Sequence, residues 1–120
     1  MTKTDIYSTS KLWEITPQKV ETAVKKIIEV SNPKKVILFG SYVTGYMDSN
    51  SDLDILVVTE NYVKNPHSES VRIRQALRGI MMSLDIIVLQ EEQLQKFAQT
   101  PGLIYREAIK KGKVVYELDT

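Results

Sequence analysis

The chain has 120 residues, of which 42% are hydrophobic and 26% are charged, and its formal net charge is +1. This composition is typical of one folded domain with a single core and argues against disorder. The near-neutral charge predicts no strong binding to nucleic acid or to anionic membranes. No cysteine is present, which excludes disulfides, zinc-thiolate sites and thiol chemistry. The first residues lack the apolar stretch of a signal peptide, and no window is apolar enough to span a bilayer, so the expected location is the cytoplasm.

The first expected element is a helix that starts at Pro17, after a polar leader over residues 1–15. Thr16 supplies an N-cap, and proline is favoured at the first helical position. Apolar residues then recur at helical spacing, at Val20, Ala23, Val24, Ile27 and Ile28. Ser31-Asn32-Pro33 ends the pattern. We therefore expect residues 16–120 to form one folded domain.

Three apolar runs predict strands, at residues 35–39, 53–58 and 84–89. The first shows no polar alternation, which is typical of a strand covered on both faces. A polar loop at 60–67 leads into a predicted helix at 68–79, with Ile73, Ala76, Leu77 and Ile80 on one face. Helices at 91–98 and 101–111 and a short strand at 114–116 follow. This order predicts a single α/β (α+β) domain.

The segment GSYVTGYMDSNSDLD, residues 40–54, contains most of the residues that could bind a ligand or take part in catalysis. Gly40 and Gly45 have the spacing of a P-loop, and a predicted strand precedes them as that motif requires. Tyr46 and Met47, however, stand where a P-loop needs its lysine and its magnesium-binding hydroxyl. The segment is therefore not a P-loop.

The same segment also resembles the start of a calcium loop. Asp48, Asn50 and Asp52 match the first three ligand positions of that loop. Leu53 replaces the glycine of the sharp turn, and Thr59 replaces the bidentate glutamate. Since a strand is predicted where the second helix should begin, a calcium loop is excluded as well.

The third interpretation is a phosphate-binding turn beside a metal site. Gly40 and Ser41 directly follow a strand, where backbone N–H groups and a hydroxyl can face a phosphate. Asp52 and Asp54 are two apart on a strand and thus project from the same face. Asp85 interrupts the third apolar run, and a carboxylate there is costly unless it is paired or bound to a metal. Such all-oxygen ligands suit Mg²⁺ or Mn²⁺.

The pattern G-S-x3-G-x5-S-D-x-D resembles that of the polymerase-β-type nucleotidyltransferase superfamily. It is formed here by Gly40, Ser41, Gly45, Ser51, Asp52 and Asp54. Asp85 matches the lone strand aspartate that follows the pattern in that family. The chain length, the helix before VILFG and the ending LIYREAIKKGKVVYE resemble its minimal, MNT-type branch, from about Pro17 to Glu117. The resemblance implies a small mixed sheet flanked by helices.

The resemblance also implies a reaction, in which a nucleoside monophosphate moves from an NTP to an acceptor hydroxyl and pyrophosphate leaves. Asp52, Asp54 and Asp85 would hold two Mg²⁺ ions, with Mn²⁺ as an alternative, and Asp85 would help to remove the acceptor proton. Gly40 and Ser41 would bind the triphosphate, beside Gly45 and Ser51 of the same motif.

One departure concerns the phosphates. Many relatives carry an arginine between the two glycines, where this chain has Tyr42-Val43-Thr44. Arginines of the following helix could compensate, and Arg74 and Arg78, one turn apart, are better placed for this than Arg72.

The acceptor must come from elsewhere, because the chain is too short for an added acceptor domain. Minimal members are similar to antitoxins paired with a HEPN-type ribonuclease toxin, which implies ATP as the nucleotide and a toxin tyrosine as the acceptor. A non-catalytic antitoxin or nucleotide-binding module that acts by contact remains the alternative, although three carboxylates in apolar strands favour the enzyme. Apolar positions on the later helices leave open a partner surface or a homo-oligomer.

Overall fold

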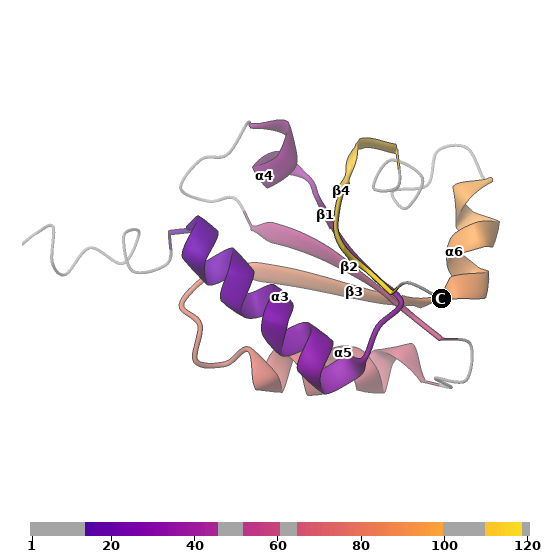
Figure 1. The fold of residues 1–120 in the computed structure, drawn as a ribbon, viewed down its shortest axis with the longest axis horizontal. Helices are drawn as coiled ribbons and strands as arrows, with labels where there is room; N and C mark the ends of the chain where they lie inside the picture. Colours follow the sequence, from indigo (N-terminus) through magenta and orange to yellow (C-terminus); the bar gives the residue numbers. More distant parts are fainter. Residues whose placement is uncertain (1–13, 46–51, 61–64, 100–109, 119–120) are drawn as a thin grey trace, which may run out of the picture.

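The computed structural model describes residues 14–45, 52–60, 65–99 and 110–118. Most of the predicted leader, Ser51 and nearly all of the predicted helix at 101–111 lie outside these residues. The elements, in chain order, are α3 (Pro17–Ser31), β1 (Lys35–Phe39), α4 (Ser41–Thr44), β2 (Leu53–Thr59), α5 (Pro66–Ala76), β3 (Leu84–Gln90), α6 (Glu91–Ala98) and β4 (Lys113–Glu117) (Figure 1). None of the described helices is long and apolar enough to cross a membrane.

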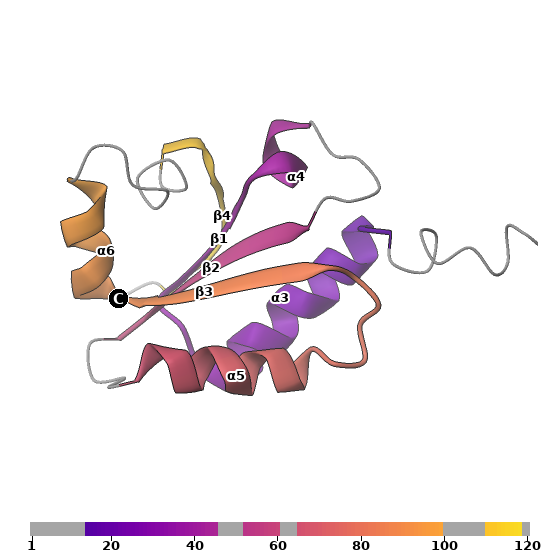
Figure 2. The same cartoon turned by 180° about the vertical axis from the view of Figure 1, so that it is seen from behind.

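The strands form one four-stranded sheet in the order β3-β2-β1-β4. β1 lies antiparallel to β2 and β4, whereas β2 and β3 are parallel and joined by the crossover helix α5. Helices α3 and α5 lie together along one face of the sheet, and α6 packs near one end of the other (Figures 1 and 2). The predicted small mixed sheet flanked by helices is thus confirmed.

Two apolar clusters explain why the central strands lack polar alternation. Ile55 and Val57 of β2 belong to the cluster under α3 and α5. Leu56 and Val58, which point the opposite way, belong to a second cluster against which Phe97 of α6 packs. Both faces are covered, so each strand buries successive residues on opposite sides.

The boundaries of α3 agree with its sequence signals. Thr16 Oγ1 accepts a hydrogen bond from the backbone N–H of Lys19 at 3.2 Å, as an N-cap does. Asn32 ends the helix in the left-handed region, at φ 45°, and donates its N–H to the carbonyl of Ile28. The terminal strand is also present, and at Lys113–Glu117 it is longer than the predicted 114–116.

The predicted bounds of the helix at 68–79 and of the loop at 60–67 were wrong. The helix α5 begins at Pro66, because the Asn65 side chain accepts a hydrogen bond from the Ser68 N–H at 3.1 Å. It ends at Ala76, and the chain then turns through residues 77–79. An Asn-Pro pair that suggested a loop is therefore the start of a helix.

Leu56 is fully buried in the central strand, so its truncation tests the second cluster. We expect Leu56→Ala to lower the free energy of unfolding by about 2–5 kcal/mol, because it removes buried methyl groups and leaves a cavity. Urea denaturation measures this. Val114→Ala is the control, since Val114 is 49% exposed and its truncation should change stability by less than about 0.5 kcal/mol. Equal losses in the two variants would contradict the assignment.

Candidate active site

Strand register brings the predicted site residues to one end of the sheet. Phe39, the last residue of β1, pairs with Asp54 near the start of β2. Asp54 in turn pairs with Asp85 near the start of β3. Gly40 and Ser41 follow Phe39 directly, so segments far apart in the sequence meet at the α4 end of the sheet (Figure 1).

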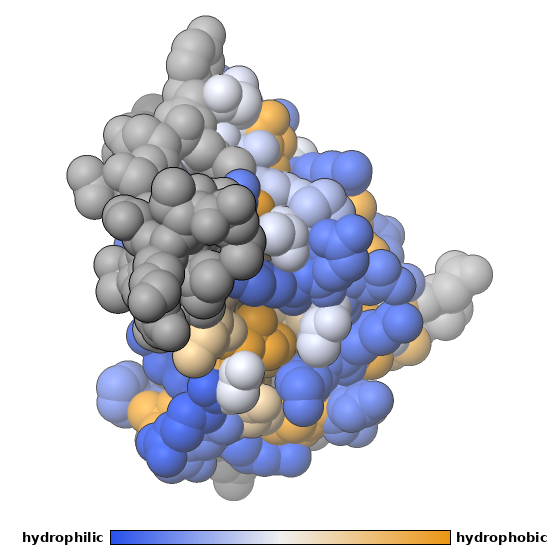
Figure 3. Space-filling view, turned by 90° about the vertical axis from the view of Figure 1, so that its left-hand side faces the viewer, coloured by the Kyte–Doolittle hydropathy of each residue, from blue (hydrophilic) through white to orange (hydrophobic). Residues whose placement is uncertain are grey.

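Asp54 and Asp85 also share one face of the sheet. In β2, Asp54 has the same parity as Leu56 and Val58, which lie on the face opposite α3 and α5. Asp85, the register partner of Asp54, follows the same alternation. Asp52 lies directly before β2, near enough to Asp54 for its charge to act on that carboxyl. Asp52 and Asp85 are exposed and Asp54 is half-buried. Hydrophilic side chains predominate on the described surface at this end of the molecule (Figure 3).

Gly40 lies against Asp54, and two properties require a glycine there. Its backbone has φ 79° and ψ −155°, a region open essentially to glycine alone. A Cβ built on Gly40 would also overlap Asp54 Oδ2 and lie 3.1 Å from its Cγ. Close packing of the backbone on the carboxylate is therefore built into this corner.

The short helix α4 follows Gly40 and turns the chain. The Gly40 carbonyl accepts hydrogen bonds from the N–H groups of Val43 and Thr44, each at 3.1 Å. Gly45, at φ 86°, ends the helix and donates its N–H to the Ser41 carbonyl at 2.9 Å. Gly45 thus ends this short helix, and Ser41 is its first residue.

The electrostatics of the site centre on Asp54. Burial raises the pKa of the Asp54 carboxyl above its ordinary value of 3.8, and the charges of Asp85 and Asp52 raise it further. Asp85 and Asp52 are therefore close enough to Asp54 for the three carboxylates to repel one another.

This shift predicts a pH-dependent stability. A carboxyl whose pKa is higher in the folded chain favours folding when protonated, and that contribution is lost as pH rises through the folded-state pKa. We expect Asp54→Asn, which carries no charge, to melt at a higher temperature than wild type at pH 7. The difference should shrink toward pH 3.8, the ordinary aspartate value. Thermal melts at the two pH values measure it.

Glu29→Gln is the control for these melts, since Glu29 is exposed on α3, away from the site. It should leave the melting temperature unchanged at both pH values. A destabilised Asp54→Asn at pH 7, or a difference that does not depend on pH, would contradict the account of Asp54.

The donor chemistry of this corner fits a hard divalent cation. Carboxylate oxygens are the ligands that Mg²⁺ and Mn²⁺ prefer. A cation would offset both the burial of the Asp54 charge and its repulsion by Asp85 and Asp52, which together raise the pKa of Asp54. Within the described ranges, however, no three acidic, histidine or cysteine side chains are already arranged to hold a metal ion. Cation binding would therefore have to draw the carboxylates closer together.

The three arginines considered for phosphate binding lie in different surroundings. Arg74 Nη2 donates to the Ile86 carbonyl at 3.1 Å and lies 3.7 Å from Asp85 Oδ1. Arg78 lies in the turn after α5, so the two are not one turn apart on a continuous helix. Arg72 pairs with Glu69 at 3.1 Å on the exposed side of α5. Sequence spacing shows no link between Arg74 and Asp85, because the contact depends on how α5 packs against β3.

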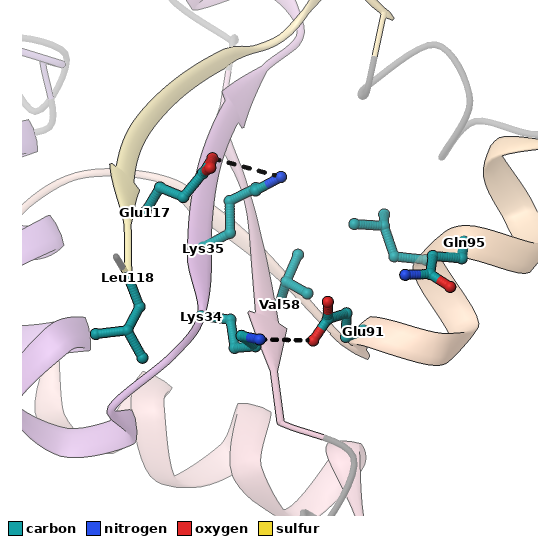
Figure 4. Close-up of a pocket in the computed structure, with 8 residues that line it drawn as sticks. Lys34, Lys35, Val58, Glu91, Gln95, Glu117 and Leu118 are labelled. Carbon is teal, nitrogen blue, oxygen red and sulfur yellow. Dashed lines mark ion pairs between the residues drawn. The ribbon is translucent and has the colours of Figure 1, made fainter. Parts of the chain in front are cut away.

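A pocket of about 280 Å³ lies at the opposite end of the sheet (Figure 4). Two ion pairs border it, Lys34 with Glu91 at 3.0 Å and Lys35 with Glu117 at 3.6 Å. The bond to Glu91 raises the pKa of Lys34 above 10.5. None of the predicted site residues lines this pocket, whose cations and acids already neutralise one another.

Comparison with known proteins places the chain in a family. The sequence profile described as "Polymerase beta, Nucleotidyltransferase" matches residues 21–120, which include the whole corner around Gly40, Asp54 and Asp85. The chain belongs to this nucleotidyltransferase family. No significant match was found among curated proteins.

Three solved structures share the fold of this family member at low sequence identity. A Sulfolobus solfataricus protein described as a candidate nucleotidyltransferase has a TM-score of 0.58 and 20% identity over 98% of this chain and 90% of its own. A toxin–antitoxin structure with AMP-PNP has a TM-score of 0.53 and 22% identity over 82% and 73%. A mutant MntA–HpeT toxin–antitoxin structure has a TM-score of 0.50 and 17% identity over 87% and 75%. At these identities the likeness concerns the fold.

Proposed function

We propose that the chain is a Mg²⁺-dependent enzyme that transfers a nucleoside monophosphate from an NTP, ATP in the first place, to an acceptor hydroxyl. One observation carries the proposal. Asp54 and Asp85 are register partners on one face of the sheet, and Gly40 packs against Asp54 where β1 ends. The matched family profile supports the same activity.

In this mechanism the protein contributes position and charge. Asp52, Asp54 and Asp85 would hold Mg²⁺ or Mn²⁺, which neutralises the attacking and leaving oxygens of an in-line displacement when bound. Because Gly40 has no side chain, a phosphate could approach its backbone beside Asp54. The Ser41 hydroxyl at the start of α4 would donate a hydrogen bond to a phosphate oxygen. Asp85, which is exposed, would accept the proton of the acceptor hydroxyl.

The acceptor that we propose is a tyrosine of a HEPN-type toxin, which the chain would silence as its antitoxin. Two of the structural neighbours come from toxin–antitoxin complexes, and one of these was solved with AMP-PNP, an adenine nucleotide. The other carries two Asp-to-Glu substitutions at the spacing of Asp52 and Asp54. These likenesses support a protein partner and an adenine nucleotide for this chain.

Position-specific labelling of ATP tests the reaction class. The purified chain is incubated with Mg²⁺ and the co-expressed toxin, or a lysate of the source cells, and with ATP labelled at the α- or the γ-phosphate. We expect label from the α-phosphate to appear on a protein and label from the γ-phosphate to leave as pyrophosphate. Transfer of the γ-phosphate would indicate a kinase instead. Neutralisation of the toxin with no transfer would indicate an antitoxin that acts by contact.

A further inference from the structure

Arg74 and Asp85 come from different elements and meet across the edge of the sheet. The helix α5 and the turn that follows it pack against one face through Ile73 and Leu77, both buried there. Asp85 follows the alternation of Ile87 and Leu89, which lie toward the other face. Since β3 is an edge strand, the Arg74 side chain must reach around that edge to lie beside Asp85.

The guanidinium is anchored by the backbone as well as by charge. Arg74 Nη2 donates to the Ile86 carbonyl at 3.1 Å, whereas its distance to Asp85 Oδ1 is 3.7 Å. The stronger contact is therefore to a fixed atom of the strand, next to Asp85 in the sequence. An exposed ion pair alone would be mobile and weak, but a donor held by a strand carbonyl keeps its charge in one place.

We propose that Arg74 is a positioning residue for Asp85, which it orients for divalent-cation binding; this rests on the proposed function. The fixed guanidinium faces Oδ1 and leaves Oδ2 for the cation. The guanidinium also places a positive charge beside Asp85, whose carboxylate repels Asp54. This charge lowers the electrostatic cost of bringing the two aspartates closer together. Groups that orient metal ligands in this way typically change metal affinity by about 10- to 100-fold when removed.

The direction of the effect distinguishes orientation from competition. If Arg74 orients Asp85, its loss weakens cation binding. If the guanidinium instead competes with the cation for the carboxylate, its loss strengthens binding. If the pair is an ordinary surface contact, its loss changes nothing.

The test measures Mn²⁺ binding by the electron paramagnetic resonance of free Mn²⁺, with the full chain and without nucleotide or acceptor. We expect Arg74→Gln to raise the dissociation constant about 10-fold, and Arg74→Lys to restore part of the affinity because it retains a donor and a charge. The matched control is Arg72→Gln, on the same helix and ion-paired with Glu69, which should bind Mn²⁺ like wild type. Thermal melts establish that each variant is folded.

A double substitution isolates the pair. In an Asp85→Asn background, Arg74→Gln should have no further effect on Mn²⁺ binding, since Arg74 acts through Asp85. Tighter binding or unchanged binding in Arg74→Gln overturns the proposal, as does a wild-type chain that binds no Mn²⁺. An Arg74-dependent Mn²⁺ affinity in a chain that transfers no nucleotide supports the positioning role and refutes the proposed enzyme, so the two failures are distinguishable.

Discussion

Gly40→Ala is expected to reduce nucleotidyl transfer by about 100-fold or more, even where the chain still folds. The added Cβ would overlap Asp54 Oδ2, so the carboxylate must move away from the corner that it shares with Gly40. The residue also has φ 79° and ψ −155°, and forcing alanine there costs about 1–3 kcal/mol. Transfer assays and urea denaturation measure the two effects separately.

Gly45→Ala is the matched control for this loss. Gly45 also has a positive φ, 86°, but a Cβ built there meets no atom within 4 Å. We expect a loss of stability of about 1 kcal/mol from backbone strain and a small effect on transfer. Equal losses of transfer in the two variants would show that the contact with Asp54 is unimportant and that strain alone matters.

The second large effect concerns the carboxylates themselves. Asp52→Asn and Asp54→Asn should each lower transfer by about 100-fold or more, because a neutral amide replaces a charged oxygen ligand. Asp85→Asn should do the same by removing the proton acceptor as well. For Asp54→Asn the loss of transfer should accompany a gain in stability at pH 7. The substitution removes a carboxylate whose charge is half-buried and repelled by Asp85 and Asp52, the two causes that raise its pKa. The rates are measured with α-labelled ATP.

Glu60→Gln is the control for these substitutions. Glu60 directly follows β2 at the end of the strand away from Asp54, so the same chemical change is made far from the corner. It should leave transfer unchanged. A Glu60→Gln variant as impaired as Asp54→Asn would mean that transfer responds to net charge rather than to the site.

The sequence predicted the local parts of the site well, for physical reasons. Apolar runs without alternation identify covered strands, and β1, β2 and β3 lie where those runs lie. The two-residue spacing of Asp52 and Asp54 predicts that both project from one face, and the structure places Asp54 in β2 and Asp52 directly before it. Gly40 and Gly45 were identified by the motif, and both have the positive φ that glycine tolerates.

Other parts depend on tertiary pairing that spacing does not encode. Asp85 lies beside Asp54 only because β3 pairs with β2 in parallel, a register set by packing under α5. The contact of Arg74 with Asp85 likewise depends on the position of α5 against an edge strand. The start of α5 at Pro66 was missed because an Asn-Pro pair serves equally as a turn or as a helix N-terminus.

The central claim is that Asp54 and Asp85, with Gly40, form a nucleotidyl-transfer site. The most direct measurement is the intact mass of the proposed toxin partner, co-purified with the chain, after incubation with ATP and Mg²⁺, with wild type and with Asp54→Asn. The account predicts that wild type adds one or more AMP groups to the toxin, on tyrosine, and that Asp54→Asn adds none while still binding the toxin. A toxin that is silenced without any gain in mass, equally by both forms, would contradict it.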